Sequence, residues 1–245
     1  MAILYKYRPY SVRSLEILIK KELYFASPQQ LNDPYDCQLS IVDTLSEAID
    51  RTRQTRSKLL DVLEKLQNIE ELNIKIATDF ANAGVLSLAR IPMNVLMWSH
   101  YADDHRGFVL GFELSDKFTT HDNAEHIIGA ADVIYCESNP FTDFFLNFEL
   151  EVPSYDDYWS SLMEIGLRAK NVCWAYEEEV RVLRKVSGAV SFRPYELREI
   201  IFGLNMPESD QKVVRTILSG HDWKHVSYRK IVRTNGFALD VVSAH

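Results

Sequence analysis

The sequence predicts an α+β protein with a split sheet of mixed or antiparallel strands, flanking helices and one helical insertion. Strand-like segments rich in aromatic and aliphatic residues occur near both ends of the chain. A long polar stretch with helical periodicity separates them at residues 44–83, and the last third alternates short strands with a helix at uneven spacing. Uneven spacing favours α+β over a regular series of parallel βαβ units.

The expected N-terminal elements are a strand, a helix and a second strand. Residues 2–7 (AILYKY) read as a strand that ends before Pro9, because proline cannot continue a central ladder. Leucine and isoleucine recur at helical spacing over residues 12–21, and residues 22–27 (ELYFAS) form the next strand, which Pro28 stops. The sequence NDP that follows predicts a turn, which could line the mouth of a pocket.

Residues 44–83 are expected to form two amphipathic helices. Leu59 and Leu63 begin a series of apolar residues at the helical period, charged residues occupy the other faces, and Gly84 closes the stretch. No linker rich in Gly, Ser or Pro divides the chain. We therefore expect a single domain over residues 1–245 with a helical insertion.

The remaining elements follow from the same periodicities. A short helix with a turn is expected at residues 94–105, and longer helices are expected at residues 155–173 and 208–218. Strands are expected at residues 85–91, 108–114, 133–136, 179–184, 190–194, 200–204, 225–232 and 237–242.

Composition and charge narrow the class of protein. Of the 245 residues, 47% are hydrophobic and 25% are charged, as in ordinary globular proteins. No apolar run approaches the roughly 20 residues that cross a bilayer, and the N-terminus does not read as a secretory signal. The net charge of −8 disfavours long-range attraction to nucleic acid, and the three cysteines, odd in number and far apart, suit a reducing compartment. We expect a soluble cytoplasmic protein with no membrane partner.

Three consecutive glutamates, Glu177, Glu178 and Glu179, stand where a helix is expected to run into the strand EVRVLR. Strand alternation turns the valines toward the core and places Glu179 on the opposite face with Arg181. Adjacent carboxylates repel one another, so a partly buried site needs a compensating partner. The sequence is equally consistent with a functional carboxylate site and with a solvated helix end where Arg181 forms a surface ion pair.

The sequence SHYADDHRG holds the one local group with metal-ligand chemistry, at His100, Asp103, Asp104 and His105. His100 and Asp104 would share a helix face at i and i+4. No third ligand stands nearby at a familiar spacing, so a hydrogen-bonded pair at a helix end is favoured and no metal is expected.

Four motifs in order, LYKYRP, LYFASPQQLNDPYD, MWSHYADDHRGFVLGF and WAYEEEVRVL, resemble the bacterial family called domain of unknown function 2971. The resemblance extends over nearly all of the chain outside residues 44–83. The name of that family implies no activity.

A second resemblance, to ADP-ribosyltransferases, rests on the order of three features. Those proteins carry a polar residue in the first strand, a later strand similar to YFA, and a Glu-x-Glu pair or single Glu just before a Val-Leu strand. Here Lys6 or Tyr7, then LYFAS, then Glu177 and Glu179 stand in that order. The first-strand centre holds neither His nor Arg, and SLAR stands where those enzymes have Ser-Thr-Ser. The resemblance implies an ADP-ribosyltransferase-like sheet and NAD as the substrate.

The same resemblance implies roles for particular residues. Cleavage of the bond between ribose and nicotinamide builds positive charge on the sugar, which a fixed carboxylate such as Glu179 would stabilise in the transition state. Glu177 would act on the acceptor. Aromatic rings could stack on nicotinamide, and cations could hold the diphosphate. The implied NAD-binding residues are Lys6, Tyr7, Arg8, Tyr24, Ser27 and Arg106.

We therefore expect an NAD-dependent ADP-ribosyltransferase-like or NAD-cleaving protein, with a role as a toxin or antiviral defence effector implied by the resemblance alone. The acceptor, protein or nucleic acid, is left open. A metal-dependent hydrolase or nuclease built on His100, Asp104 and His105, and a non-enzymatic sensing or scaffold module, are the alternatives. If NAD is the substrate, the strands that carry Lys6, Tyr24 and Glu179 must meet around one cleft.

Overall fold

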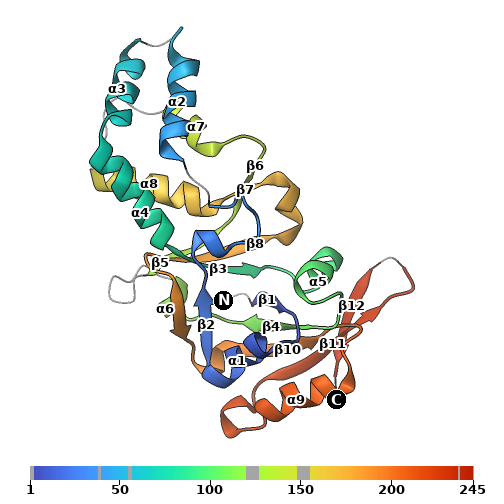
Figure 1. Cartoon of the computed structure of the whole chain (residues 1–245). Coiled ribbons are helices and arrows are strands. Elements are labelled where there is room, and N and C mark those ends of the chain that lie inside the picture. Colours follow the sequence, from blue (N-terminus) through green and yellow to red (C-terminus); the bar gives the residue numbers. More distant parts are fainter. Residues whose placement is uncertain are drawn as a thin grey trace.

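The computed structural model describes residues 3–37, 40–54, 57–119, 127–147, 155–236 and 238–244, and it has an α+β fold built on one large sheet (Figure 1). The sheet has eight strands: β1 (Leu4–Arg8), β3 (Gly84–Ala89), β4 (Phe108–Phe112), β5 (Ile127–Asp132), β8 (Glu179–Arg184), β10 (Leu197–Phe202), β11 (Ser227–Arg233) and β12 (Leu239–Ser243). Their order is β12-β11-β10-β4-β1-β3-β8-β5. All neighbours pair antiparallel except β10 and β11, which confirms the α+β class and the mixed, mostly antiparallel sheet.

Two small sheets and the helices complete the described fold. One small sheet pairs β2 (Glu22–Phe25) with β9 (Gly188–Ser191), and the other pairs β6 (Ile134–Cys136) with β7 (Ala169–Asn171). The α-helices are α1 (Val12–Lys20), α2 (Ile41–Thr52), α3 (Ser57–Gln67), α4 (Glu70–Asn82), α5 (Val95–Tyr101), α6 (Asp116–Thr119), α7 (Pro140–Leu146), α8 (Tyr155–Arg168) and α9 (Glu208–Ile217). Four 3₁₀-helices lie between them: η1 (Pro28–Gln30), η2 (Val172–Glu177), η3 (Pro194–Glu196) and η4 (His221–Trp223). None of the helices described here is long and apolar enough to span a membrane.

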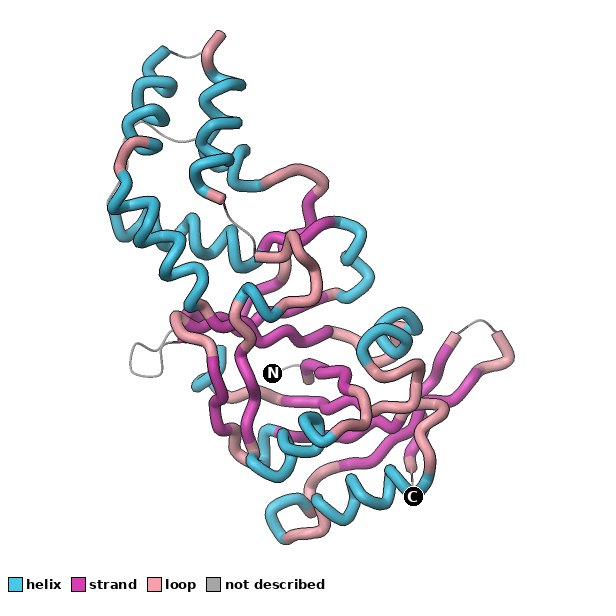
Figure 2. The backbone as a smooth tube through the Cα atoms, viewed as in Figure 1, coloured by secondary structure: helices cyan, strands magenta, loops and turns pink. Residues whose placement is uncertain are grey.

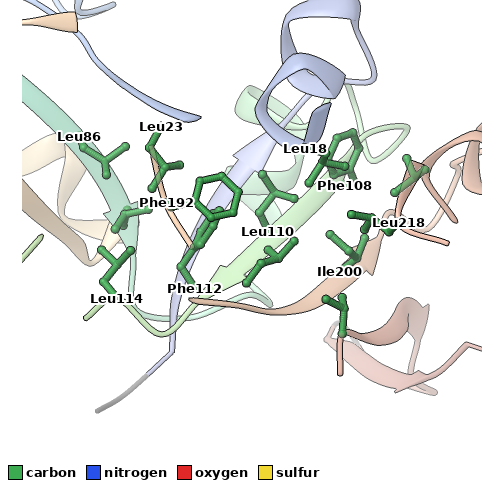
Figure 3. Packing of buried hydrophobic residues seen from close by; sticks show 14 of the residues in the cluster. Leu18, Leu23, Leu86, Phe108, Leu110, Phe112, Leu114, Phe192, Ile200 and Leu218 are labelled. Carbon is green, nitrogen blue, oxygen red and sulfur yellow. The ribbon is translucent and has the colours of Figure 1, made fainter. Parts of the chain in front are cut away.

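The central strands are apolar on both faces because helices cover both faces. In β4, Phe108 and Leu110 pack with Leu18 of α1 in one cluster, whereas Val109 between them packs with Trp98 of α5 in another. Figure 3 shows Leu110 and Phe112 within the first cluster. A strand covered on both faces reads as a continuous apolar run, which explains the FVLGF sequence.

A group of helices lies beyond the β8 and β5 end of the sheet (Figure 2). Helices α2, α3, α4, α7 and α8 share one hydrophobic cluster that also includes Val85 of β3 and Leu183 of β8. The helical group and the sheet therefore have a common core. The assignment of residues 1–245 to one domain stays a prediction.

The described part of residues 44–83 forms three helices, so the expectation of two was wrong. The first begins at Ile41, capped by the Ser40 side chain, which accepts a hydrogen bond from the Asp43 amide. The break between α3 and α4 falls at Asn68, whose side chain donates to the Glu64 carbonyl at 2.8 Å. An amide that binds the preceding turn competes with helix continuation, while the apolar period runs on through the break. Residues 55–56 lie outside the described residues, as do residue 2 and Phe237 at the ends of two expected strands.

The helix expected over residues 155–173 ends at Arg168, five residues early. The next three residues form β7, which pairs in parallel with β6, and the Asn171 side chain then caps η2 by accepting from the Cys173 amide at 3.0 Å. The pairing of β7 with β6 thus overrides the helical spacing of apolar residues that continues to residue 173. The change to extended backbone buries the side chain of Lys170.

Candidate functional site

A cavity of about 760 Å³ lies against the sheet, with walls from β1, β2, β3, β8 and α1. Its lining includes six of the eight residues assigned to NAD from the sequence: Lys6, Tyr7, Arg8, Tyr24, Glu177 and Glu179. The structure therefore brings together side chains from three strands that are far apart in the sequence. Their roles toward NAD stay predictions.

The glutamates belong to a buried ionic cluster that we call the Lys170–Arg181 cluster, made of Asp36, Lys170, Glu177, Glu179 and Arg181. The Lys170 ammonium lies 2.8 Å from Glu179 Oε2, forms an ion pair with Glu177, and lies 3.7 Å from Asp36. The Arg181 guanidinium lies 2.8 Å from Glu179 Oε1 and 2.5 Å from Asp36 Oδ2. If all five groups are ionised, the cluster carries one excess negative charge.

Burial of this cluster overturns the solvated alternative for the glutamate run. Glu177 and Glu179 are each 4% exposed and Arg181 is 0% exposed, so Arg181 is not a surface ion-pair partner. Strand alternation places Glu179 and Arg181 on the face opposite Val182 as expected, but helices cover that face too. Of the three consecutive glutamates, only Glu178 is exposed. It is the C-cap residue of η2 and has a left-handed backbone conformation with φ of 45°.

The pKa values of Glu177 and Glu179 are shifted in opposite directions. Burial alone would raise the pKa of Glu179, but the Arg181 and Lys170 cations outweigh it and lower the pKa to about 2. For Glu177 burial dominates, and together with the nearby Glu179 charge it raises the pKa despite hydrogen bonds from Lys170 and Tyr101. A pair of carboxyls held at different pKa values is a common property of acid–base sites.

Tyr101 extends the cluster toward the turn that follows η1. Its hydroxyl donates to Glu177 Oε1 at 2.5 Å and accepts from Asn32 Nδ2 at 3.0 Å. Both residues line the cavity, so the NDP turn does lie at the pocket. Tyr101 was not identified from the sequence as a site residue, because nothing local in the sequence shows that η2 brings Glu177 to it.

Tyr101→Phe is expected to raise the pKa of Glu177 further and to destabilise the fold by about 1–3 kcal/mol, because the carboxylate loses a donor that favours its ionised form. Carboxyl-carbon NMR titration of Glu177 measures the first effect and chemical unfolding the second. Tyr5→Phe removes a comparable 3.0 Å hydrogen bond to Glu199, outside this cluster, and serves as the control. An unchanged Glu177 titration in Tyr101→Phe would contradict the assigned bond.

Another wall of the cavity carries cations. Arg8 donates from Nε to Ser14 Oγ at 3.2 Å, and among the described residues neither Arg8 nor Arg13 forms a salt bridge. Burial and the neighbouring Arg13 lower the pKa of Arg8. Two arginines that face one cavity and form no salt bridge within the described part of the chain favour an anionic ligand.

Ser27 and Arg106, the other two residues assigned to NAD, are not among the cavity-lining residues described. Ser27 is the N-cap residue of η1, and its backbone amide donates to Gln30 Oε1 at 3.0 Å. Arg106 is exposed in the turn after α5. Ser27 ends the motif LYFAS and Arg106 stands in SHYADDHRG, but nothing in the sequence indicated where their side chains point.

The side chains of SHYADDHRG are not arranged as the metal-ligand interpretation requires. Helix α5 ends at Tyr101, and Asp103, Asp104 and His105 have left-handed φ values of 49°, 48° and 66°, so His100 and Asp104 do not share a helix face. His100 instead lies 3.0 Å from the Tyr176 hydroxyl. Within the described ranges, no three His, Cys, Asp or Glu side chains gather as a metal site would require.

The fold and site thus define an α+β protein with a ligand-sized cavity floored by a buried cluster of carboxylates and cations. Residues 97–182 match the model of the family described as Protein of unknown function (DUF2971), which confirms the resemblance to that family over this stretch. The match spans Tyr101, Lys170, Glu177, Glu179 and all but the end of β8. No curated protein and no solved structure matches the chain.

Proposed function

We propose that the cavity binds NAD and that Glu179 promotes cleavage of the bond between ribose and nicotinamide, with β1, β2 and β8 related as in ADP-ribosyltransferases. The observation that carries the proposal is convergence: Lys6, Arg8, Tyr24 and Glu179, on three separate strands, line one cavity. Convergent polar groups in a ligand-sized cavity are the usual mark of a binding or active site.

The electrostatics of Glu179 suit this chemistry. Departure of nicotinamide leaves positive charge on the ribose, and a carboxylate stabilises that charge best when it is already fixed in place. Lys170 and Arg181 hold both oxygens of Glu179, and the low pKa keeps it ionised at neutral pH. Two cations offset part of its charge, but Asp36 and Glu177 restore a net negative cluster when ionised.

Glu177 is the proposed base toward the acceptor. Its raised pKa brings it closer to the range in which a carboxylate takes up a proton at neutral pH. Arg8 and Arg13 would hold the diphosphate, with Lys6 as a third contact, and Tyr7 or Tyr24 would stack on the nicotinamide ring. The acceptor would be a protein, a nucleic acid or water. A cytoplasmic effector role, as a toxin or in antiviral defence, completes the proposal.

The purified protein is expected to release nicotinamide from NAD, and the rate should persist in EDTA because the proposed step needs no Lewis acid. Chromatography of the products measures it, first with water and then with protein or nucleic-acid acceptors. Complete loss of activity in EDTA with recovery in manganese would instead favour the hydrolase alternative. Absence of release with every acceptor would overturn NAD cleavage.

A second candidate is a non-enzymatic module that senses an anionic nucleotide. It is favoured by one observation: every carboxylate oxygen of Glu177 and Glu179 already accepts a hydrogen bond from Tyr101, Lys170 or Arg181. Such a network stabilises a unique structure without any chemistry. Calorimetric binding of NAD without nicotinamide release would support this candidate.

A further inference from the structure

Lys6 has an unusual environment for a lysine. It lies in β1 opposite Leu110 of β4, is partly buried, and lines the cavity. Its ammonium donates to the Ser87 carbonyl at 3.0 Å, and among the described residues no carboxylate forms a salt bridge with it. A lysine that leaves water normally acquires an acidic partner.

The other two lysines that line the cavity provide a direct comparison. Lys170 is surrounded by Asp36, Glu177 and Glu179, and burial, which would lower its pKa, is outweighed by Glu179 and Glu177, which raise it. Lys20 is exposed and pairs with Glu16 at 2.8 Å. Both of these amines are thus held in the charged form, whereas Lys6 has a neutral carbonyl as its partner.

The consequence for Lys6 is a population of free amine. Burial and the neighbouring Arg8 charge lower its pKa to about 8, with Glu179 opposing them. At pH 7 roughly a tenth of such side chains are neutral, against fewer than about one in a thousand for an ordinary lysine. A neutral amine in a cavity is the nucleophilic form that attacks carbonyl carbons.

We propose that Lys6 is a carbonyl-reactive lysine that forms an imine with aldehydes carrying a phosphate or carboxylate group. Arg8 and Arg13 on the same cavity wall would bind the anionic group and bring the aldehyde to Lys6 Nζ. The nitrogen forms a bond to the aldehyde carbon, and the carbonyl oxygen leaves as water with the two amine hydrogens. No oxidant or reductant takes part, and the reaction is independent of NAD cleavage.

Pyridoxal 5′-phosphate is a suitable probe, because it combines an aldehyde with a phosphate. The wild-type protein is treated with a limiting amount, the imine is reduced with borohydride, and labelled peptides are mapped by mass spectrometry. Lys6 is expected to be labelled at least about 10-fold faster than Lys20 and Lys170 at pH 7.5, with a half-maximal rate near pH 8. Pyridoxal without phosphate should label Lys6 about 10-fold more slowly.

Lys6→Arg keeps the positive charge and should lose the fast-reacting site, and Arg13→Gln should reduce the preference for the phosphorylated probe. Equal labelling of Lys6 and Lys20 in the wild-type protein would overturn the proposal, and that result needs no variant to fold. Equal reaction with pyridoxal and its phosphate would overturn the anion requirement. Because no arm of the experiment contains NAD, its outcome is separate from that of the nicotinamide assay.

Discussion

Glu179→Gln is expected to lower the rate of nicotinamide release by about 10²- to 10³-fold, since it removes the fixed charge aimed at the transition state. The variant should also be less stable by about 3–5 kcal/mol, because Lys170 and Arg181 lose a buried counter-charge. Both carboxylate oxygens of Glu179 accept hydrogen bonds from cations, and glutamine would replace one of these acceptors with an NH₂ donor. The rate is therefore measured well below the melting temperature, with thermal melts alongside.

The control for lost stability is Glu199→Gln. Glu199 is a buried carboxylate, 5% exposed, that pairs with Arg229 at 3.2 Å and is not among the cavity-lining residues. Its replacement should destabilise the protein but preserve nicotinamide release. Glu178→Gln, at an exposed position, should change neither property. Equal rate losses in the Glu179 and Glu199 variants would show that stability, not charge at the cavity, sets the rate.

Glu177→Gln should give an intermediate result. If Glu177 acts as the base toward the acceptor, its loss reduces transfer to an acceptor more than it reduces cleavage of NAD. The ratio of transferred ADP-ribose to released nicotinamide measures this difference. A uniform loss of both products would instead place Glu177 with Glu179 at the bond that breaks.

Arg181→Met is expected to destabilise the fold by about 3–5 kcal/mol, as much as Glu179→Gln, which corresponds to a melting temperature lower by roughly 6–20 °C. Arg181 is fully buried and donates to Glu179, Asp36 and the Leu167 carbonyl, and each of these largely buried groups would lose that donor. Methionine fills much of the volume but donates nothing. Chemical unfolding at neutral pH gives the comparison.

Arg90→Met is the matched control, because Arg90 and Asp132 form an ion pair whose side chains are 48% and 61% exposed. Exposed pairs contribute little, so this variant should melt close to the wild type. Similar destabilisation of the two variants would mean that burial of Arg181 does not determine its contribution.

The Lys170–Arg181 cluster should make the stability of the wild-type protein sensitive to acid. The pKa of Glu179 is lower in the folded chain than its ordinary value, so it contributes stability that is complete above about pH 4 and is lost as the pH falls toward about 2. In Arg181→Met this component should shrink, because Arg181 is the cation that lowers the pKa of Glu179 most. Unfolding measured at several pH values gives both slopes.

Local patterns in the sequence determined much of the framework. Pro9 limits β1, the apolar run FVLGF marks β4, and helix α9 occupies the interval expected from its period. The alternation in EVRVLR correctly placed Glu179 and Arg181 on one face of β8. These predictions succeeded because the direction of a side chain along a regular element depends on the backbone repeat alone.

The tertiary structure alone decided which groups surround those side chains. The hydrogen bond from Arg181 to Asp36 joins residues 145 positions apart, and Lys170 enters the cluster because β7 pairs with β6 where the helical period would have continued. Strand β5, in which two isoleucines are followed by Gly129 and two alanines, had no periodic signal. Whether a charge lies in water or must find a partner depends on which distant segments cover it, and the free energy of burying a charge makes that coverage decisive.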